Sequence, residues 1–282
     1  MDGKIPADRG GAALLHRLAD RWRLRLLAPL LNRLLPNACA LCGGDSDGAL
    51  CPGCEAQFFG PAAAIPRCAC CANPLRGATA ADALDSAALG SGIVQDALLC
   101  GACLHQPPAF DRTLVAADYV LPVDQLVLQL KFGHRLALAP LCARLLRDAV
   151  LREAARRPDS AAVPALLCPV PLGPRRLAER GYNQALEIAR PLARGLGIAL
   201  AARLVHRVHE TAAQSSVTPA ERQANIAGAF AIPDAALVAG RHIGVVDDVM
   251  TSGRTLNELA ATLKRHGAAR VSNYVFARTP PH

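Results

Sequence analysis

Two adjacent acids and a hydroxyl-rich segment follow an apolar run near the carboxyl end of the chain. The run is HIGVVDDVMTSGRT at residues 242–255, and its branched residues do not alternate with polar ones. Such a run is typical of a strand buried on both faces of a parallel sheet. From Thr255 leucines recur at helical spacing. We therefore predict a strand, a loop and a helix, with Asp247 and Asp248 at the carboxyl end of the strand.

The loop suits a phosphate and the acids suit a sugar. A loop that enters a helix presents backbone N–H groups, hydroxyls and the helix N-terminus to an anion. Carboxylates accept hydrogen bonds from sugar hydroxyls or organise Mg²⁺ near a polyphosphate. A phosphorylated sugar would use both groups. The alternative is that Asp247 only caps the following turn and that the Thr and Ser side chains are solvated loop residues.

Eight cysteines form four CxxC pairs in two sets. The first set is Cys39, Cys42, Cys51 and Cys54, and the second is Cys68, Cys71, Cys100 and Cys103. Four thiolates are the tetrahedral set that Zn²⁺ prefers, and they leave no position for a catalytic water, so the predicted zinc is structural. Two pairings stay open, namely two sequential sites or alternate pairs sharing a metal. Thiols without metal are the other alternative.

Composition sets limits on location and partners. The net charge of +8 is compatible with phosphorylated metabolites or nucleic acid, whereas aromatic residues make up only 4% of the chain. A stacking surface for single-stranded DNA would therefore need to be built from few rings. The sequence has no long uncharged apolar stretch and no predicted secretion signal, and it has eleven cysteines. These features predict a chain without a membrane span in a reducing cytoplasm.

Changes in composition divide the chain into three predicted parts. Residues 1–37 form a basic amphipathic helical segment, residues 38–110 a double zinc-knuckle module, and residues 111–282 an α/β domain. Within the last part, apolar runs predict strands at 113–119, 165–170 and 271–277. Helical spacing predicts helices near 123–130 and 138–149, and a basic loop over residues 175–180 offers a second anion site.

The segment from Val245 to Thr255 resembles the signature of the type I phosphoribosyltransferases, which bind 5-phosphoribosyl-1-pyrophosphate (PRPP). The resemblance implies a parallel-sheet α/β fold, with ribose hydroxyls on the two acids and the 5-phosphate on the loop. The PRPP-binding residues implied here are Asp247, Asp248, Val249, Met250, Thr251, Ser252, Gly253, Arg254 and Thr255.

The wider arrangement resembles the ComF family, also described as GntX-like. The resemblance rests on the cysteine knuckles, Lys131-Phe132, RGYNQ at 180–184 and the VVDDVMTSGRT segment. It implies a pyrophosphate loop at Pro169 and Val170, and Lys131 and Arg180 as the cationic groups for the leaving pyrophosphate. It also implies a loop that covers PRPP. The residues given to that loop are Arg207, Thr211 and Gln214.

Two functional hypotheses follow from this resemblance. The first is a Mg²⁺-dependent phosphoribosyltransferase linked to natural competence and the use of imported DNA. The second is a non-catalytic protein that senses PRPP or a related phosphorylated ribose and binds single-stranded DNA or competence proteins. Turnover of PRPP would favour the first hypothesis, and salt-dependent DNA binding without turnover would favour the second.

Overall fold

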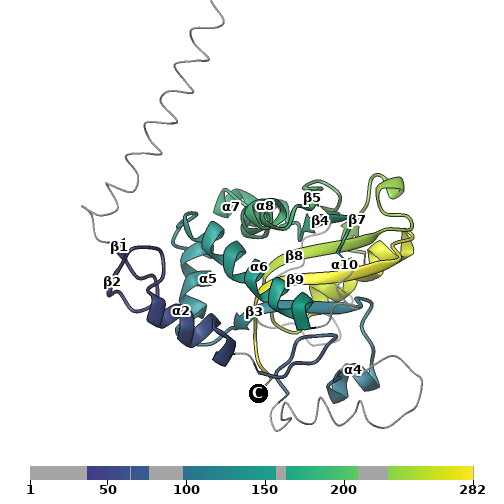
Figure 1. Ribbon diagram of the computed structural model, residues 1–282. Coiled ribbons are helices and arrows are strands. Elements are labelled where there is room, and N and C mark those ends of the chain that lie inside the picture. Colours follow the sequence, from purple (N-terminus) through teal and green to yellow (C-terminus); the bar gives the residue numbers. More distant parts are fainter. Residues whose placement is uncertain (1–36, 64, 76–97, 157–162, 209–227, 282) are drawn as a thin grey trace, which may run out of the picture. The chain divides into compact units, whose positions relative to one another are not determined.

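The computed structural model describes residues 37–63, 65–75, 98–156, 163–208 and 228–281 (Figure 1). The chain divides into two compact units, Met1–Glu55 and Ala56–His282. The predicted basic helix before residue 37 lies outside the described residues. The three-part division at residues 37/38 and 110/111 stays a prediction. No helix among the described residues is long and apolar enough to cross a membrane.

The first unit is small and built around cysteines. Its strands β1 (Asn37–Ala38) and β2 (Asp45–Ser46) pair in an antiparallel hairpin. The amide of Cys39 donates to the carbonyl of Gly44 at 2.7 Å, and helix α2 begins at Pro52 (Pro52–Phe59). The buried apolar residues of this hairpin and helix start are Cys39, Leu50 and Cys54. So little apolar burial cannot by itself offset the entropy of ordering the chain.

A five-stranded parallel sheet forms the centre of the second unit, as the sequence predicted. Its strands are β3 (Arg112–Asp118), β4 (Leu166–Pro169), β5 (Ala199–Leu200), β8 (His242–Met250) and β9 (Arg270–Arg278). They are ordered β3-β9-β8-β4-β5. The middle strands are buried along most of their length, because helices or loops cover both faces.

Helices α6 and α8 pack on one face of the sheet, and helix α10 packs on the other (Figure 1). The helices are α4 (Gly101–His105), α5 (Asp124–Lys131), α6 (Leu138–Arg156), α7 (Pro174–Arg180), α8 (Gln184–Leu196) and α10 (Arg254–Arg265). Short 3₁₀ helices span Pro61–Ala63 and Ala235–Leu237. The leucines predicted to face the core from α10 are buried. Three residues of the second cysteine set, Cys68, Cys71 and Cys103, belong to the same buried cluster as α10.

Two local predictions differ from the structure. Strand β8 continues to Met250. Asp247 and Asp248 therefore lie within the last four residues of the strand, which still pair with β9, and not beyond its end. The basic segment 175–180 is helix α7 and not a loop, because Pro174 begins it and Gly181 ends it in a left-handed conformation (φ +78°). Helix α8 runs through Pro191 without ending there.

The strand order places a candidate ligand site. From β4 the chain passes through α8 to β5 on one side, and from β8 it passes through α10 to β9 on the other side. The direction therefore changes between β4 and β8. In open parallel sheets ligands bind at such a point, beyond the carboxyl ends of the strands.

Candidate functional site

Two clusters of four cysteines have the geometry of metal sites. Within each cluster the four sulfur atoms lie within 4.8 Å of one another. The Sγ atoms of Cys42 and Cys51 are 3.8 Å apart, and those of Cys71 and Cys100 are 3.6 Å apart. Tetrahedral Zn–S bonds of about 2.3 Å would separate the sulfurs by roughly 3.8 Å, whereas a disulfide needs about 2.05 Å. All cysteines of the clusters are free thiols, so these donor sets fit a zinc ion.

The clusters settle how the CxxC pairs combine. Cys39, Cys42, Cys51 and Cys54 form one group, and Cys68, Cys71, Cys100 and Cys103 form the other. The sulfur atoms therefore group as the sequential arrangement predicts and not as the interleaved arrangement does. Cys70 stays outside, since its thiol points to the carbonyl oxygen of Phe110 at 3.6 Å. Cys142 and Cys168 are fully buried in the core, as predicted, and burial raises the pKa of Cys168 to about 12.

The two acids differ in their surroundings. Asp248 is buried, with 2% of its surface exposed, and its Oδ2 atom lies 2.8 Å from Nζ of Lys131. Asp247 is half-buried, and its Oδ1 atom accepts a hydrogen bond from the backbone amide of Asp248 at 2.9 Å. Lys131 thus meets an acid directly, although it was predicted to face pyrophosphate. Asp247 is the acid with more solvent access.

Burial and a neighbouring charge disfavour the ionised form of Asp247. Desolvation is the larger cause and the Asp248 carboxylate the next, and together they raise the pKa of Asp247 well above its usual range. The ammonium of Lys131 acts in the opposite direction. A hydroxyl-bearing ligand could therefore bind to a carboxyl pair that is not fully compensated within the protein.

The segment after β8 is open to an anion. The side chains of Thr251, Ser252 and Arg254 are exposed. Helix α10 begins after Gly253, and no side chain caps its first amides. Uncapped amides at a helix start carry the positive end of the helix dipole. Gly253 has a φ of +76°, a backbone conformation that favours glycine, and a Cβ atom there would also displace the terminal methyl of Met250, which lies 2.5 Å from its position.

The pyrophosphate loop that the resemblance implies begins at the end of the neighbouring strand. Pro169 ends β4 opposite Val246, and the amide of Val170 donates to the Val246 carbonyl at 2.9 Å. Asn183 binds the same segment. Its Nδ2 donates to the Val170 carbonyl at 2.9 Å, and its Oδ1 accepts from the first amides of α8 as the helix cap. The structure therefore brings Pro169 and Val170 beside the acid-bearing strand.

Arg180 contacts the ring of Phe132, the residue that follows Lys131. Its guanidinium stands 5.4 Å from the ring centre of Phe132 and donates to Oε1 of Gln184. The hydroxyl of Tyr182 donates to the carbonyl of Leu130, which ties the end of α5 to the segment before α8. The RGYNQ residues thus fix the end of α5 relative to β4.

Arg207 belongs to a separate hairpin, in which β6 (His206–Arg207) pairs with β7 (Phe230–Ala231). Its guanidinium lies 5.6 Å from the ring centre of Phe230. Thr211 and Gln214, which were assigned to the same PRPP-covering loop, lie outside the described residues. The structure therefore gives no view of that loop beyond its two ends.

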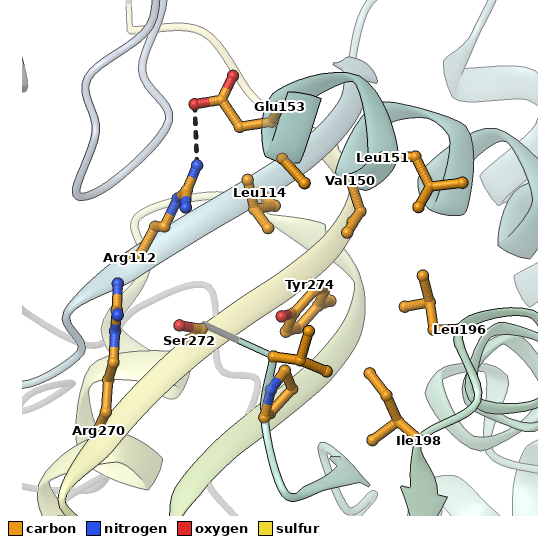
Figure 2. A pocket seen from close by; sticks show the side chains of 13 residues that line it. Arg112, Leu114, Val150, Leu151, Glu153, Leu196, Ile198, Arg270, Ser272 and Tyr274 are labelled. Carbon is orange, nitrogen blue, oxygen red and sulfur yellow. Dashed lines mark hydrogen bonds and ion pairs between the residues drawn. The ribbon is translucent and has the colours of Figure 1, made fainter. Parts of the chain in front are cut away.

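A cavity of about 140 Å³ lies at the opposite end of the sheet (Figure 2). It is lined by the first residues of β3 and β9, including Arg112 and Arg270, and by the carboxyl end of α6, where Glu153 pairs with Arg112 at 2.8 Å. Tyr274 and Ser272 form part of its floor. None of the predicted site residues reaches it, so it is separate from the acids.

Sequence reasoning missed Arg278, the last residue of β9. Its side chain is buried, and its guanidinium donates to the carbonyls of Met250 and Thr251 at the start of the hydroxyl-rich segment. An arginine directly after the apolar run Val275 to Ala277 was a visible signal, since buried charges are rare. Its partners are backbone atoms, which leave no pattern in the sequence.

Comparisons with known proteins agree with this geometry. The sequence profile of the phosphoribosyl transferase domain family matches residues 183–281. The chain is 40% identical to DNA utilization protein YhgH of Salmonella typhi over 182 residues, which are 64% of this chain and 78% of that protein. It is 30% identical to competence protein F of Haemophilus influenzae over 244 residues, which are 85% of this chain and 96% of that protein.

The solved structures that match the chain include phosphoribosyltransferases. One is glutamine phosphoribosylpyrophosphate amidotransferase from B. subtilis, with 16% identity and a TM-score of 0.33 over 49% of this chain and 26% of that chain. Another is hypoxanthine-guanine phosphoribosyl transferase of L. donovani, with 16% identity and a TM-score of 0.30 over 50% of this chain and 71% of that chain. The strand order, the domain match and the two relatives together show that this chain belongs to the ComF family and has a type I phosphoribosyltransferase fold.

Proposed function

We propose that this chain binds Mg²⁺-PRPP at the carboxyl ends of β8 and β4 and transfers the phosphoribosyl group to an acceptor. The observation that carries the proposal is a single stretch, residues 247–255. It combines a carboxyl pair with exposed hydroxyls and an uncapped helix start. Few small ligands need both a hydroxyl-accepting pair and an anion cradle, and a phosphorylated ribose is one of them. The free thiols of both cysteine clusters suit a location in the cytoplasm.

Each part of the stretch has a role in this proposal. Asp247 and Asp248 accept hydrogen bonds from the ribose hydroxyls, with Asp247 more accessible. Thr251, Ser252 and the amides that begin α10 bind the 5-phosphate. Carboxylates beside the ligand could also help to hold Mg²⁺, which would supply charge neutralisation at the pyrophosphate. Lys131 is partly exposed, so its ammonium can turn from Asp248 to a phosphate oxygen.

The reaction needs positive charge where pyrophosphate leaves. A lone pair of the acceptor forms a bond to C1 of the ribose while the bond from C1 to the pyrophosphate oxygen breaks, and that electron pair leaves with pyrophosphate. Cationic groups placed in advance stabilise the developing charge without reorganisation. Lys131 and Arg180 have this role in the proposal, which is supported by the contact of Lys131 with Asp248 and by the contact of Arg180 with Phe132, the residue after Lys131.

Pyrophosphate release distinguishes an enzyme from a binding protein. We expect release from Mg²⁺-PRPP with at least one member of a panel of nucleobases, ammonia and water. The variant Arg180→Ala should lower release more than it lowers affinity for a nucleoside monophosphate, because an interaction made only with leaving pyrophosphate lowers the barrier. The control is the double variant Asp247→Asn/Asp248→Asn. If release from the parent never exceeds that of the control while PRPP still binds, the transfer reaction is wrong.

A second candidate function is DNA or partner binding without turnover. It is favoured by the names of the relatives, which refer to DNA utilization and competence, and by the net charge of +8. Binding of single-stranded DNA by basic side chains releases counterions, so affinity should fall steeply with salt, with a slope of about −0.7 per phosphate neutralised. Fluorescence anisotropy of a labelled oligonucleotide between low and physiological salt tests this. A flat affinity would rule out the basic-surface explanation.

A further inference from the structure

Arg278 joins two sites that the sequence treats as separate. It is 6% exposed at the carboxyl end of β9, its guanidinium donates to four backbone carbonyls, and the side chain of Cys71 also interacts with it. No carboxylate of the described chain pairs with it in an ion pair. A buried charge is costly unless hydrogen bonds replace its water, so each of these carbonyls is a needed partner.

One side of the guanidinium holds the start of the anion-binding segment. Its Nη1 atom donates to the carbonyl of Met250 at 3.1 Å and to the carbonyl of Thr251. It also donates to the carbonyl of Thr279 at 2.6 Å, and the Thr279 amide donates to Met250 at 3.0 Å. The backbone direction at residues 250–251 decides where the amides and hydroxyls that follow can point. Arg278 therefore fixes the entry to residues 251–255.

The other side holds a knuckle of the second cysteine cluster. Nε of Arg278 donates to the carbonyl of Cys71 at 3.1 Å. That knuckle is a tight turn, in which the amide of Ala72 donates to the Cys68 carbonyl at 2.8 Å and Ala72 has a φ of +56°. Arg67 adds a hydrogen bond to the carbonyl of Ala72 and an ion pair to Asp118 of β3 at 2.7 Å. Metal bound by Cys68 and Cys71 would hold this turn, and with it the carbonyl that Arg278 needs.

A planar guanidinium with donors in fixed directions transmits a displacement of one partner to the other. If the Cys71 carbonyl moved after metal loss, Arg278 would lose one of the acceptors that offset its burial. It would then shift or draw in water, and the carbonyls of Met250 and Thr251 would lose a defined partner. The first cysteine cluster has no such link among the hydrogen bonds of the described residues.

We infer that Arg278 is a positioning residue through which metal at Cys68, Cys71, Cys100 and Cys103 shapes the anion-binding segment 251–255. This inference rests on the proposed function for its ligand, ribose 5-phosphate. The coupling is reciprocal by thermodynamic necessity. Ribose 5-phosphate must therefore raise the affinity for metal by the same factor by which metal raises the affinity for ribose 5-phosphate. Couplings of this kind typically amount to about 5- to 150-fold.

The test uses the full chain loaded with zinc and the probe ribose 5-phosphate. Calorimetry should show binding to the parent, and binding about tenfold weaker to Arg278→Lys, which keeps the charge but loses the planar fork. The variant Cys100→Ser, which removes a ligand of the second cluster and leaves Arg278 in place, should weaken binding similarly. The matched control is Cys70→Ser, which changes a thiol inside the Cys68–Cys71 knuckle but outside the cluster and should bind like the parent.

Two further measurements do not depend on activity. Ribose 5-phosphate should raise the equilibrium affinity of the parent for zinc, measured by competition with a chromophoric chelator, by about tenfold, and this gain should be absent in Arg278→Lys. Without any ligand, hydrogen exchange at the amides of residues 251–255 should be faster in Arg278→Lys and in Cys100→Ser than in Cys70→Ser.

The outcomes separate the two claims. If the parent binds ribose 5-phosphate and both variants bind it equally well with unchanged exchange, the link through Arg278 is overturned and the proposed function stands. If the parent binds no ribose 5-phosphate but exchange at 251–255 rises in both variants, the proposed function fails and the link stands. Absence of both effects overturns both claims. If Arg278→Lys does not fold, the comparison of Cys100→Ser with Cys70→Ser decides alone.

Discussion

Asp247→Asn is expected to raise the melting temperature of the unliganded protein while removing most of its response to PRPP. Burial, and then the charge of Asp248, raise the pKa of Asp247, so ionisation of this group costs free energy in the folded state. Asparagine has no charge to bury and can still accept the hydrogen bond from the amide of Asp248. We expect a rise of about 2–4 °C, which corresponds to ~1 kcal/mol in a chain of this size.

The pH dependence of this gain has a definite sign. Because the folded pKa of Asp247 lies above the unfolded one, the cost of ionisation is absent below the unfolded pKa. It grows as the pH rises from there through the folded pKa, and is full above it. The difference in melting temperature between Asp247→Asn and the parent should therefore be largest at neutral and alkaline pH and vanish near pH 4. Asp148→Asn, at a surface pair with Arg147, is the matched control. If the parent melts at a higher temperature than Asp247→Asn at neutral pH, the assignment of a raised pKa to Asp247 is contradicted.

The loss of ligand response follows from mass action. A ligand that binds only the folded state stabilises it by about 2.7 kcal/mol at a hundred times its Kd. In the Asp247→Asn variant the uncharged amide is a weaker acceptor for a ribose hydroxyl than a carboxylate is, and it attracts Mg²⁺ less. The Asp247→Asn variant should thus be more stable than the parent without ligand and less stable than the parent with ligand. This pattern is expected of a side chain that serves ligand binding and not folding.

Cys39→Ser or Cys54→Ser is expected to unfold the first unit and to leave the second unit folded. The hairpin and helix start around residues 37–55 bury little beyond Cys39, Leu50 and Cys54, so metal binding must supply their folding free energy. Structural zinc supplies about 10–16 kcal/mol in isolated zinc-finger peptides. The parallel sheet of the second unit has its own buried core. Each variant should therefore lose about one metal equivalent and become sensitive to protease only in its first unit.

Native mass spectrometry with limited proteolysis measures both effects. Cys70→Ser serves as the control, because its thiol lies outside both clusters and a serine hydroxyl can still donate to the carbonyl of Phe110. The control should keep two metal ions and the cleavage pattern of the parent. Parent protein prepared without chelator that contains almost no zinc would show that the clusters are not metal sites.

Much of the fold was predictable because its information is local and periodic. The unbroken apolar run before Asp247 predicted a central parallel strand, and the spacing of leucines after Thr255 predicted α10. The CxxC spacing predicted the metal donors but not their grouping, since spacing within a knuckle says nothing about which knuckle folds against it.

The remaining features depend on contacts between distant segments. The pair of Lys131 with Asp248 joins the end of α5 to β8, and no local pattern links the two. Arg278 binds carbonyl oxygens, which every residue carries, so its partners are invisible in the sequence. Helix α7 is a different case, because Pro174 and Gly181 mark its ends in the sequence. The arginines between them favour a basic loop only if these two end signals are ignored.

Direct binding of Mg²⁺-PRPP to the zinc-loaded chain, measured by isothermal titration calorimetry, tests the central claim. The parent should bind about one PRPP per chain, and Asp247→Asn/Asp248→Asn should bind it at least tenfold more weakly while Asp148→Asn binds it like the parent. A parent and a double variant with the same affinity for PRPP would contradict the assignment of these acids to the ribose. A parent that binds no PRPP at all would contradict the proposed site as a whole.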